Sequence, residues 1–475
     1  MNTYQMYING HWVGENLDSI EVKNPADDQV VGSVPYAGEK ETNEAINVAY
    51  TAFQEWSRLT AYERSDYLRK LYKLMMENEE ELAEIMTKEM GKPIKESRGE
   101  VKYAASFIDW FAEEGKRVYG ETVPSHAGNK RLQVWKKPVG VVGAITPWNF
   151  PAAMLTRKMG PALAAGCTVV IKPSSESPLT AIKLVELCEQ AGFPKGVVNL
   201  VTGSSSKIAK AMMENKKVRK ITFTGSTEVG KLLIRQSADQ VKKLSLELGG
   251  HAPLIVLDDA DIETAVKGAV ASKFRNAGQT CICANRIYVQ SGLYDRFVEK
   301  FAEEVQKLKV GNGLDDSVDV GPLINKDGFD KVVDHVQDAK DKGANVVVGG
   351  EAYSEAGSMF YTPTVLKDVN GDMAVMQEET FGPVAPIQKV ETEEEAIKLA
   401  NGTPYGLAAY VFTENVARGM RVIEQLDFGI VGWNDGAPSA AQVPFGGMKE
   451  SGYGREGGHE GIEAFLESQY VAIGL

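Results

Sequence analysis

Cysteine is scarce in this sequence, with only four Cys among 475 residues. That number is too small for a disulfide framework in so long a chain, and it favours a reducing compartment. Long apolar runs are also missing, since no segment reaches the roughly 18 uninterrupted apolar residues of a membrane-spanning helix. The first residues, MNTYQMYINGHWVG, lack the basic and apolar regions of a signal peptide. These absences favour a cytoplasmic protein without a membrane partner.

An excess of positive charge is absent as well. Lys and Arg number 52 against 65 Asp and Glu, which gives a formal net charge of −13. Proteins that bind nucleic acid need a basic surface to neutralise phosphates, so we expect no nucleic-acid partner. The five histidines lack the HExxH spacing and the CxxC partners of zinc sites, so we expect no metal. Cys167 and Cys188 lie in apolar or helical contexts and are predicted to be buried structural thiols.

The length and the apolar pattern predict a multidomain α/β protein. About 100–200 residues per domain gives two or three domains. From residue 139 onward, short β-rich runs alternate with helical segments, which is typical of βαβ units and a parallel sheet. The predicted strands are 139–145, 168–173, 197–201, 220–225 and 252–257. After residue 258 the alternation continues with helices near 261–276 and 293–310 and strands at 285–290, 344–350 and 363–369, which predicts a second α/β domain.

The predicted domains have the following boundaries. Residues 1–120 and 138–249 form a doubly wound nucleotide-binding domain, with long amphipathic helices at 42–59 and 62–90, and residues 250–450 form the second, catalytic domain. Two strand-like segments, 121–137 and 463–475, interrupt or follow this pattern. These segments are able to pair with each other or with another subunit, so we interpret them as a small β arm for oligomerisation.

Two glycine-rich motifs are candidates for phosphate binding. GYGREG, with Gly452, Gly454 and Gly457, has the GxGxxG spacing, but it follows loop-like residues rather than a strand. We therefore predict a surface loop there. ITFTGSTEVG instead turns from a β-branched strand through Gly225 and Ser226 into a helix, whose N-terminus attracts anions. An ordinary serine N-cap explains this second motif equally well.

Single residues in three further motifs are candidates for catalysis. Asn149 in PWNFP is held between two prolines, as an oxyanion donor would be, although a proline-rich turn is the simpler reading. Glu247 in LELGG lies among apolar residues, which raise a carboxyl pKa toward that of a general base, although a structural ion pair has the same surroundings. Cys281 and Cys283 in NAGQTCICANR are either a nucleophile and its neighbour, half of a metal site or two buried apolar groups.

Taken together, PWNFP, FTGSTEVG, LELGG, GQTC and EETFGP occur in the order and approximate spacing of the aldehyde dehydrogenase superfamily, which the chain resembles over essentially its whole length. The resemblance implies that Cys281 is the nucleophile, Glu247 the base and Asn149 the oxyanion donor. In this mechanism the thiolate attacks the aldehyde and forms a thiohemiacetal, and hydride transfer to nicotinamide then converts it to a thioester. Water activated by Glu247 hydrolyses the thioester to the acid.

The same resemblance implies the cofactor site. Its matching positions are Trp148, Lys172, Gly225, Ser226, Gly230, Leu248, Glu379 and Phe381. Many relatives that use NAD carry Glu where this chain has Ser175, and a carboxylate there would repel a 2′-phosphate. Ser175 beside Lys172 therefore favours NADP, with NAD also possible because Glu176 follows directly.

A closer resemblance is to the succinate-semialdehyde dehydrogenase branch, through PAAMLTRKMGPALAAGC, ASKFRNAGQTCICANR and the final residues GREGGHEGIEAFLESQYVAIGL. It implies that Arg157, Arg275 and Ser439 hold the distal carboxylate of succinate semialdehyde, with structural ion pairs as the alternative for the arginines. It also implies that Cys283 forms a reversible, inactivating disulfide with Cys281, with a simply packed thiol as an equal alternative. The predicted arm favours a homodimer or homotetramer. Residues 434–447 depart from the branch. Glutarate semialdehyde, 2-oxoglutarate semialdehyde and broad aliphatic aldehydes therefore remain alternative substrates.

Overall fold

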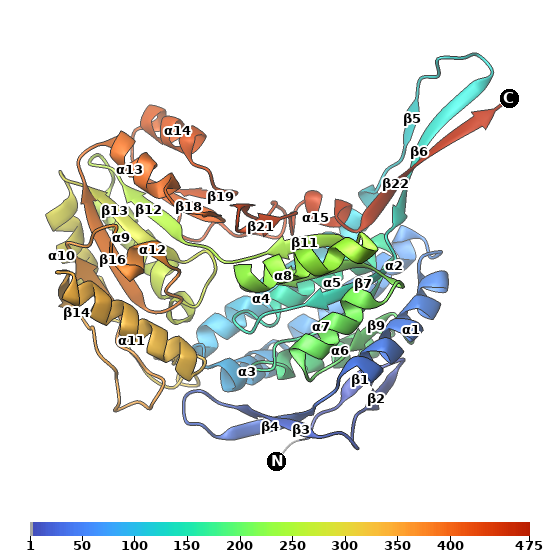
Figure 1. Cartoon of the computed structure of the whole chain (residues 1–475), viewed down its shortest axis with the longest axis horizontal. Helices are drawn as coiled ribbons and strands as arrows, with labels where there is room; N and C mark the ends of the chain where they lie inside the picture. The colour runs from blue at the N-terminus through green and yellow to red at the C-terminus, as the bar shows by residue number, and fades with distance from the viewer. Residues whose placement is uncertain (1–2) are drawn as a thin grey trace.

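The computed structural model describes residues 3–475 and has two lobes, from which a narrow arm projects (Figure 1). The first lobe contains an eight-stranded sheet in the order β2-β1-β9-β8-β7-β10-β11-β21. Its five central strands are parallel. In sheet order, the strands span His11–Val13, Met6–Ile8, Val198–Leu200, Thr168–Lys172, Val141–Ile145, Val218–Thr224, Lys243–Glu247 and Gly452–Tyr453. This is the predicted doubly wound sheet.

Helices cover both faces of this sheet. One face packs against α2 to α6 and the other against α1, α7 and α8, with a separate apolar core on each side. Because β7 and β8 are buried on both faces, they read as continuous apolar runs rather than alternating ones. The helices span Glu39–Trp56 (α1), Ala61–Glu77 (α2), Glu79–Met90 (α3), Ile94–Glu114 (α4), Ala153–Ala165 (α5), Leu179–Gln190 (α6), Ser205–Glu214 (α7) and Thr227–Ser237 (α8).

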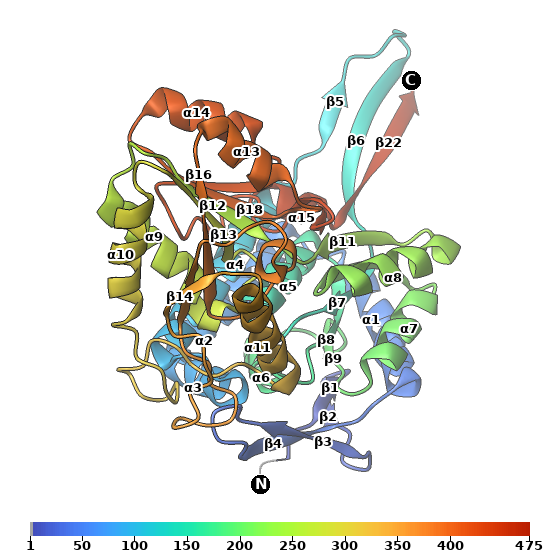
Figure 2. The ribbon, with the colours of Figure 1, turned by 60° about the vertical axis from the view of Figure 1, so that its left-hand side comes forward.

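The second lobe contains a seven-stranded sheet in the order β14-β15-β16-β13-β12-β18-β19, parallel except for β14. In sheet order, its strands span Asn345–Val348, Thr364–Lys367, Val384–Val390, Ala284–Gln290, Ala252–Val256, Ala408–Phe412 and Ile430–Trp433. Its main helices span Ile262–Phe274 (α9), Tyr294–Val305 (α10), Lys326–Asp341 (α11), Glu393–Asn401 (α13) and Val416–Gln425 (α14). Helices α13 and α14 lie at the same end of the molecule as the arm (Figure 2).

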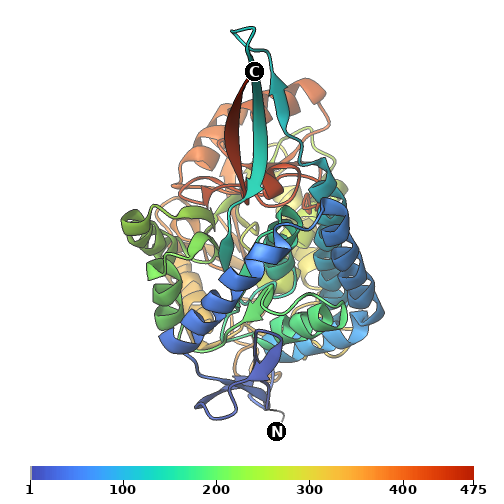
Figure 3. The same cartoon turned by 90° about the vertical axis from the view of Figure 1, so that its right-hand side faces the viewer.

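The arm is a three-stranded antiparallel sheet in the order β22-β6-β5, made of Leu466–Gly474, Lys130–Pro138 and Glu121–Val123. The two strand-like segments of the sequence therefore pair with each other. Figure 3 shows the arm standing at the end of the molecule opposite the N-terminus. Trp135 and Tyr470 are exposed on it.

Two predictions about local structure need correction. The single helix predicted over 62–90 is two helices, because α2 ends at Glu77 and α3 begins at Glu79 after the Asn78 side chain donates to the Leu74 carbonyl (2.8 Å). The GYGREG segment is not a surface loop. Gly452 and Tyr453 extend the first sheet beside β11, and Glu456 is buried. Cys167 and Cys188 are fully buried, as predicted.

Candidate active site

The candidate site lies at the carboxyl ends of the central strands of the first sheet, where open α/β sheets bind ligands. Asn149 follows β7, Gly225 and Ser226 follow β10, and Glu247 is the last residue of β11. A cavity of about 280 Å³ opens there. It is lined by Pro147, Trp148, Asn149, Met154, Thr224, Gly225, Ser226, Leu248, Gly249, Cys281, Lys331, Glu379 and Phe381. Residues from separate motifs of the sequence thus meet in one place.

Cys281 reaches this cavity from a tight turn between α9 and β13. Asn276 (φ 51°) and Ala277 (φ 54°) both have left-handed backbones, which is rare for residues other than glycine and is typical of functional sites. Burial raises the pKa of the Cys281 thiol to about 12, and the nearby carboxylates of Glu379 and Glu247 add to this shift. Arg157 and Arg275 act in the opposite direction and favour the thiolate.

Asn149 is held through both its backbone and its side chain. Its Nδ2 donates to the Gln279 carbonyl two residues before Cys281 (3.0 Å), and its own carbonyl accepts from Lys92 Nζ (2.9 Å) and Asn276 Nδ2 (3.0 Å). The amide of Asn149 is therefore fixed beside the thiol, where an oxyanion donor is needed.

Lys92 is part of a buried ion pair that the sequence did not reveal. Its ammonium contacts the carboxylate of Glu100 and lies 3.8 Å from the centre of the Phe150 ring. Glu100 also accepts from the backbone N–H groups of Ala152 (3.0 Å) and Ala153 (3.2 Å), at the start of α5. This pair joins α4, α5 and the Asn149 loop into one rigid unit.

Glu247 has the environment of a general base. The residue is only 2% exposed, and its Oε2 has no hydrogen-bond partner within residues 3–475. Burial raises its pKa well above the usual value for Glu, and the negative charge of Glu456 raises it further. A carboxyl with this pKa can take a proton near neutral pH.

Glu456 is the second group that sequence reasoning missed. Its carboxylate accepts from Arg157 Nε (2.8 Å) and pairs with Lys158, whose ammonium also donates to Thr224 Oγ1 (2.6 Å). Burial opposes ionisation of Glu456, yet the two cations hold its pKa below the usual value. The only signal in the sequence was an acidic residue inside the glycine-rich GYGREG segment.

Several predicted cofactor residues line the cavity in an arrangement that suits a dinucleotide. Ser226 is the N-cap of α8, so the N-terminus of that helix faces the cavity. A Cβ on Gly230 would come within 2.5 Å of Leu248 Cδ2, so this turn of the helix packs closely on Leu248. Phe381 (φ 55°) meets Trp148 edge to face, with ring centres 5.5 Å apart.

Lys172 and Glu379 both have pKa values shifted by burial. Lys172 is buried at the end of β8, where desolvation lowers its pKa to about 8. Glu379 accepts from the Gly250 N–H (3.1 Å), and burial raises its pKa to about 7. Lys331, which the sequence did not single out, also lines the cavity and donates to the Glu379 carbonyl (2.6 Å).

Ser175 lies outside this cavity, in a neighbouring pocket of about 230 Å³. Its charged lining residues are two lysines, Lys23 and Lys326, and three carboxylates, Glu21, Asp28 and Glu176. Ser175 itself adds no charge to this pocket.

The three predicted substrate residues differ in their contacts. Arg157 is 2% exposed, is paired with Glu456 and stacks 3.8 Å over the centre of the Phe445 ring. Arg275 is half-buried, and its guanidinium makes no hydrogen bond or ion pair within residues 3–475, although it lies 5.0 Å from the centre of the Phe150 ring. The buried Ser439 hydroxyl also lacks a partner there.

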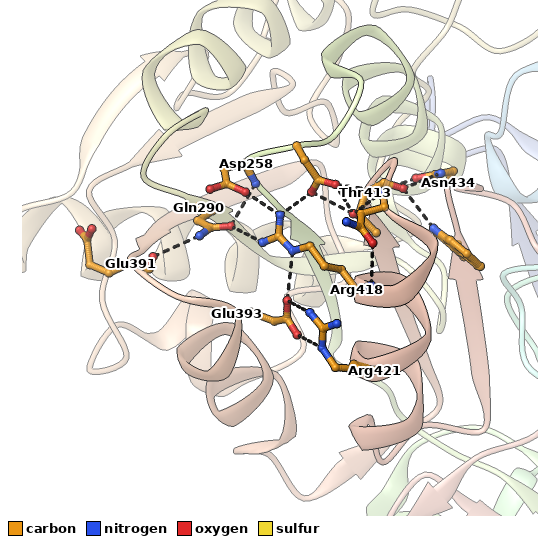
Figure 4. A network of polar contacts seen from close by, with 11 residues as sticks. Asp258, Gln290, Glu391, Glu393, Thr413, Arg418, Arg421 and Asn434 are labelled. Carbon is orange, nitrogen blue, oxygen red and sulfur yellow. Dashed lines mark hydrogen bonds and ion pairs between the residues drawn. The ribbon is translucent and has the colours of Figure 1, made fainter.

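Ser439 belongs to a loop that a polar network anchors in the second lobe (Figure 4). Arg418 Nη1 donates to the carboxylates of Asp258 and Asp259 (both 2.7 Å), and Asp259 accepts from the Thr413 hydroxyl. Thr413 in turn exchanges hydrogen bonds with Asn434, at the start of the loop. This series of hydrogen bonds fixes the start of residues 434–447.

Cys283 is fully buried and faces away from solvent. Lys273 Nζ lies 3.3 Å from its sulfur, and the thiol donates to the Lys273 carbonyl (3.4 Å). All four cysteines are free thiols.

Comparisons with known proteins agree with this geometry. A family model described as "Aldehyde dehydrogenase family" matches residues 12–471. The succinate-semialdehyde dehydrogenase [NADP(+)] of Escherichia coli K12 is 54% identical over 99% of this chain and 98% of its own. The glutarate-semialdehyde dehydrogenase of Pseudomonas putida is 52% identical over the same shares. The crystal structure of a succinate-semialdehyde dehydrogenase from Burkholderia pseudomallei superposes with a TM-score of 0.98 at 50% identity, covering 99% of this chain and 98% of that one.

Proposed function

The chain belongs to the aldehyde dehydrogenase family, and from this membership we propose that it oxidises succinate semialdehyde to succinate with NADP. It is an NAD(P)-dependent aldehyde dehydrogenase. The observation that carries the proposed substrate is Arg275, a cation beside the catalytic thiol that lacks a carboxylate partner within residues 3–475. A substrate with a distal carboxylate supplies that partner, and the planar guanidinium binds such a group well.

The residues present fit the proposed cofactor. The N-terminus of α8 is suited to the pyrophosphate, and Leu248, Phe381 and Trp148 give the cavity apolar walls. Lys172, whose burial lowers its pKa, would be stabilised as a cation by a nearby phosphate. Ser175 adds no negative charge next to it, which supports NADP over NAD. When bound, the nicotinamide supplies the hydride acceptor for the oxidation.

The residues of the chain divide the chemistry between them. Cys281 Sγ attacks the aldehyde carbon and forms a thiohemiacetal. Asn149 Nδ2 and the Cys281 N–H donate to its oxyanion, a role that the Lys92 hydrogen bond to Asn149 supports. After oxidation to the thioester, Glu247 takes a proton from the water that attacks the carbonyl carbon, and succinate leaves as the Cys281 thiolate is released.

A panel of aldehydes, each tested with NADP and NAD, examines this proposal. We expect the highest kcat/KM for succinate semialdehyde with NADP. Glutarate semialdehyde is the second candidate, because a relative named for it is 52% identical and residues 434–447 depart from the succinate-semialdehyde branch. A higher kcat/KM for uncharged aliphatic aldehydes would contradict both candidates.

We further propose that the arm joins subunits into a homodimer or homotetramer. Its outer surface exposes Trp135, Tyr470 and Ile473, and its edge strands leave backbone groups unpaired. Light scattering that finds only monomer at micromolar concentration would contradict this. The two lobes and the arm support the domain limits of 1–120 with 138–249, 250–450, and 121–137 with 463–475. Four free cysteines are consistent with a cytoplasmic location.

A further inference from the structure

Two buried hydroxyl groups near the catalytic thiol lack a well-formed hydrogen bond to any other residue of the range 3–475. The Tyr103 hydroxyl, on α4, and the Ser439 hydroxyl are both inaccessible to solvent, and neither makes a hydrogen bond of normal geometry within residues 3–475. Buried polar groups are nearly always satisfied in folded proteins, because leaving them unpaired is unfavourable. The Ser439 side chain lies close enough to Tyr103 to lower its pKa, but two hydroxyls in contact use only one of their two donors, so the pair keeps one donor for a ligand with hydrogen-bond acceptors.

Tyr103 lies near the two arginines. Its ring meets Phe107 edge to face, with centres 4.9 Å apart, and the Arg157 guanidinium lies 5.8 Å from the same Phe107 ring. Burial raises the pKa of Tyr103, while the charges of Arg157 and Arg275 and the side chain of Ser439 lower it. The phenol is thus protonated at neutral pH and remains a donor beside two cations.

These neighbours are attached to different parts of the fold. Tyr103 is on α4, Arg275 follows α9, and Ser439 is on the loop after β19. Arg157 is paired with Glu456 through Nε, but its buried Nη2 makes no hydrogen bond of normal geometry within residues 3–475, so both arginines and the two hydroxyls have donors to spare. A carboxylate has about four lone-pair positions and accepts from several donors at once.

We propose that the Tyr103 hydroxyl binds substrate directly, donating to the distal carboxylate that Arg275 and Ser439 also hold. The inference rests on the proposed function, since it requires an aldehyde with a second, anionic end. Tyr103 is on α4, which packs against α5, and its ring packs against Phe107. It therefore contributes to selection for carboxylated over uncharged aldehydes.

The Tyr103→Phe substitution tests this role, because it removes only the hydroxyl and keeps the ring against Phe107. We expect kcat/KM for succinate semialdehyde to fall about tenfold, as for loss of a hydrogen bond to a charged group, mainly through a higher KM. Activity on butanal should not change. The inhibition constant of succinate, which competes for the same pocket, should rise by a similar factor.

Tyr67→Phe is the matched control, because Tyr67 packs against Trp56 and Phe193 outside the pocket. It should leave all three measurements unchanged. Equal losses on both aldehydes in Tyr103→Phe, or no change with succinate semialdehyde and succinate, would overturn the role of Tyr103. A wild-type enzyme that does not prefer succinate semialdehyde to butanal would instead overturn the proposed function itself.

Discussion

The two arginines near Cys281 should respond differently to the same substitution, Arg→Gln. Arg157 is buried against Glu456, and removing one member of a buried ion pair costs about 3–5 kcal/mol of stability. Lys158 remains on Glu456 and offsets part of this cost, so we expect Arg157→Gln to lose about 3 kcal/mol. Arg275 has no such partner, and its substitution should change stability by less than about 0.5 kcal/mol.

For binding of the substrate carboxylate, we expect Arg275→Gln to have the larger effect. Arg275→Gln removes charged hydrogen bonds to the substrate, each worth about 1.5–3 kcal/mol, so kcat/KM for succinate semialdehyde should fall about 10- to 100-fold. Butanal should be affected much less, because it has no carboxylate to lose. Urea unfolding measures the stability change, and steady-state NADPH formation measures the kinetic one. Arg157→Gln with wild-type stability, or Arg275→Gln with equal losses on both aldehydes, would refute this division of roles.

Four further substitutions test separate parts of the site. Glu456→Gln should shift the acidic limb of the kcat pH profile to lower pH, because activity falls as Glu247 becomes protonated and the substitution removes a charge that raises its pKa. Lys92→Met should lower stability by about 3 kcal/mol and reduce kcat more than it raises KM, whereas unchanged kcat would separate Lys92 from Asn149. Ser175→Glu should lower the NADP-to-NAD ratio of kcat/KM by about tenfold or more through like-charge repulsion, and a constant ratio would refute that role. Peroxide should inactivate the wild type by oxidising the thiols of Cys281 and Cys283 to a disulfide, with release of water, and dithiothreitol should restore activity. Cys283→Ala should not be inactivated by this route. Identical behaviour of the two proteins would make Cys283 purely structural.

The sequence predicted those parts of the fold whose signal is local. Strand β8 spans 168–172 where 168–173 was expected, because a strand buried on both faces is a continuous β-branched run. Asn149 and Glu247 could be grouped because one follows and the other ends a strand of the first sheet, and carboxyl ends of parallel strands meet at one edge of a sheet. Cys281 instead precedes β13 of the second sheet, so only the resemblance to the family joined it to them.

The buried ion pairs could not be predicted in this way. Lys158 and Glu456 are 298 residues apart, and neither is distinguished from an exposed charged residue until the chain is folded. The same holds for Tyr103, which reads as one more apolar position of an amphipathic helix. Only tertiary packing shows that its hydroxyl is buried beside the arginines.

The central claim is that oxidation of succinate semialdehyde gives a thioester on Cys281, and that Glu247 activates the water that hydrolyses this thioester. Mass spectrometry of the Glu247→Gln variant, incubated with succinate semialdehyde and NADP, tests it most directly, because the thioester should form but not hydrolyse. We predict one succinyl group on the peptide that contains Cys281, absent when Cys281 is also changed to Ala. NADPH formation with no adduct, or an adduct that remains in the Cys281→Ala background, would contradict the account.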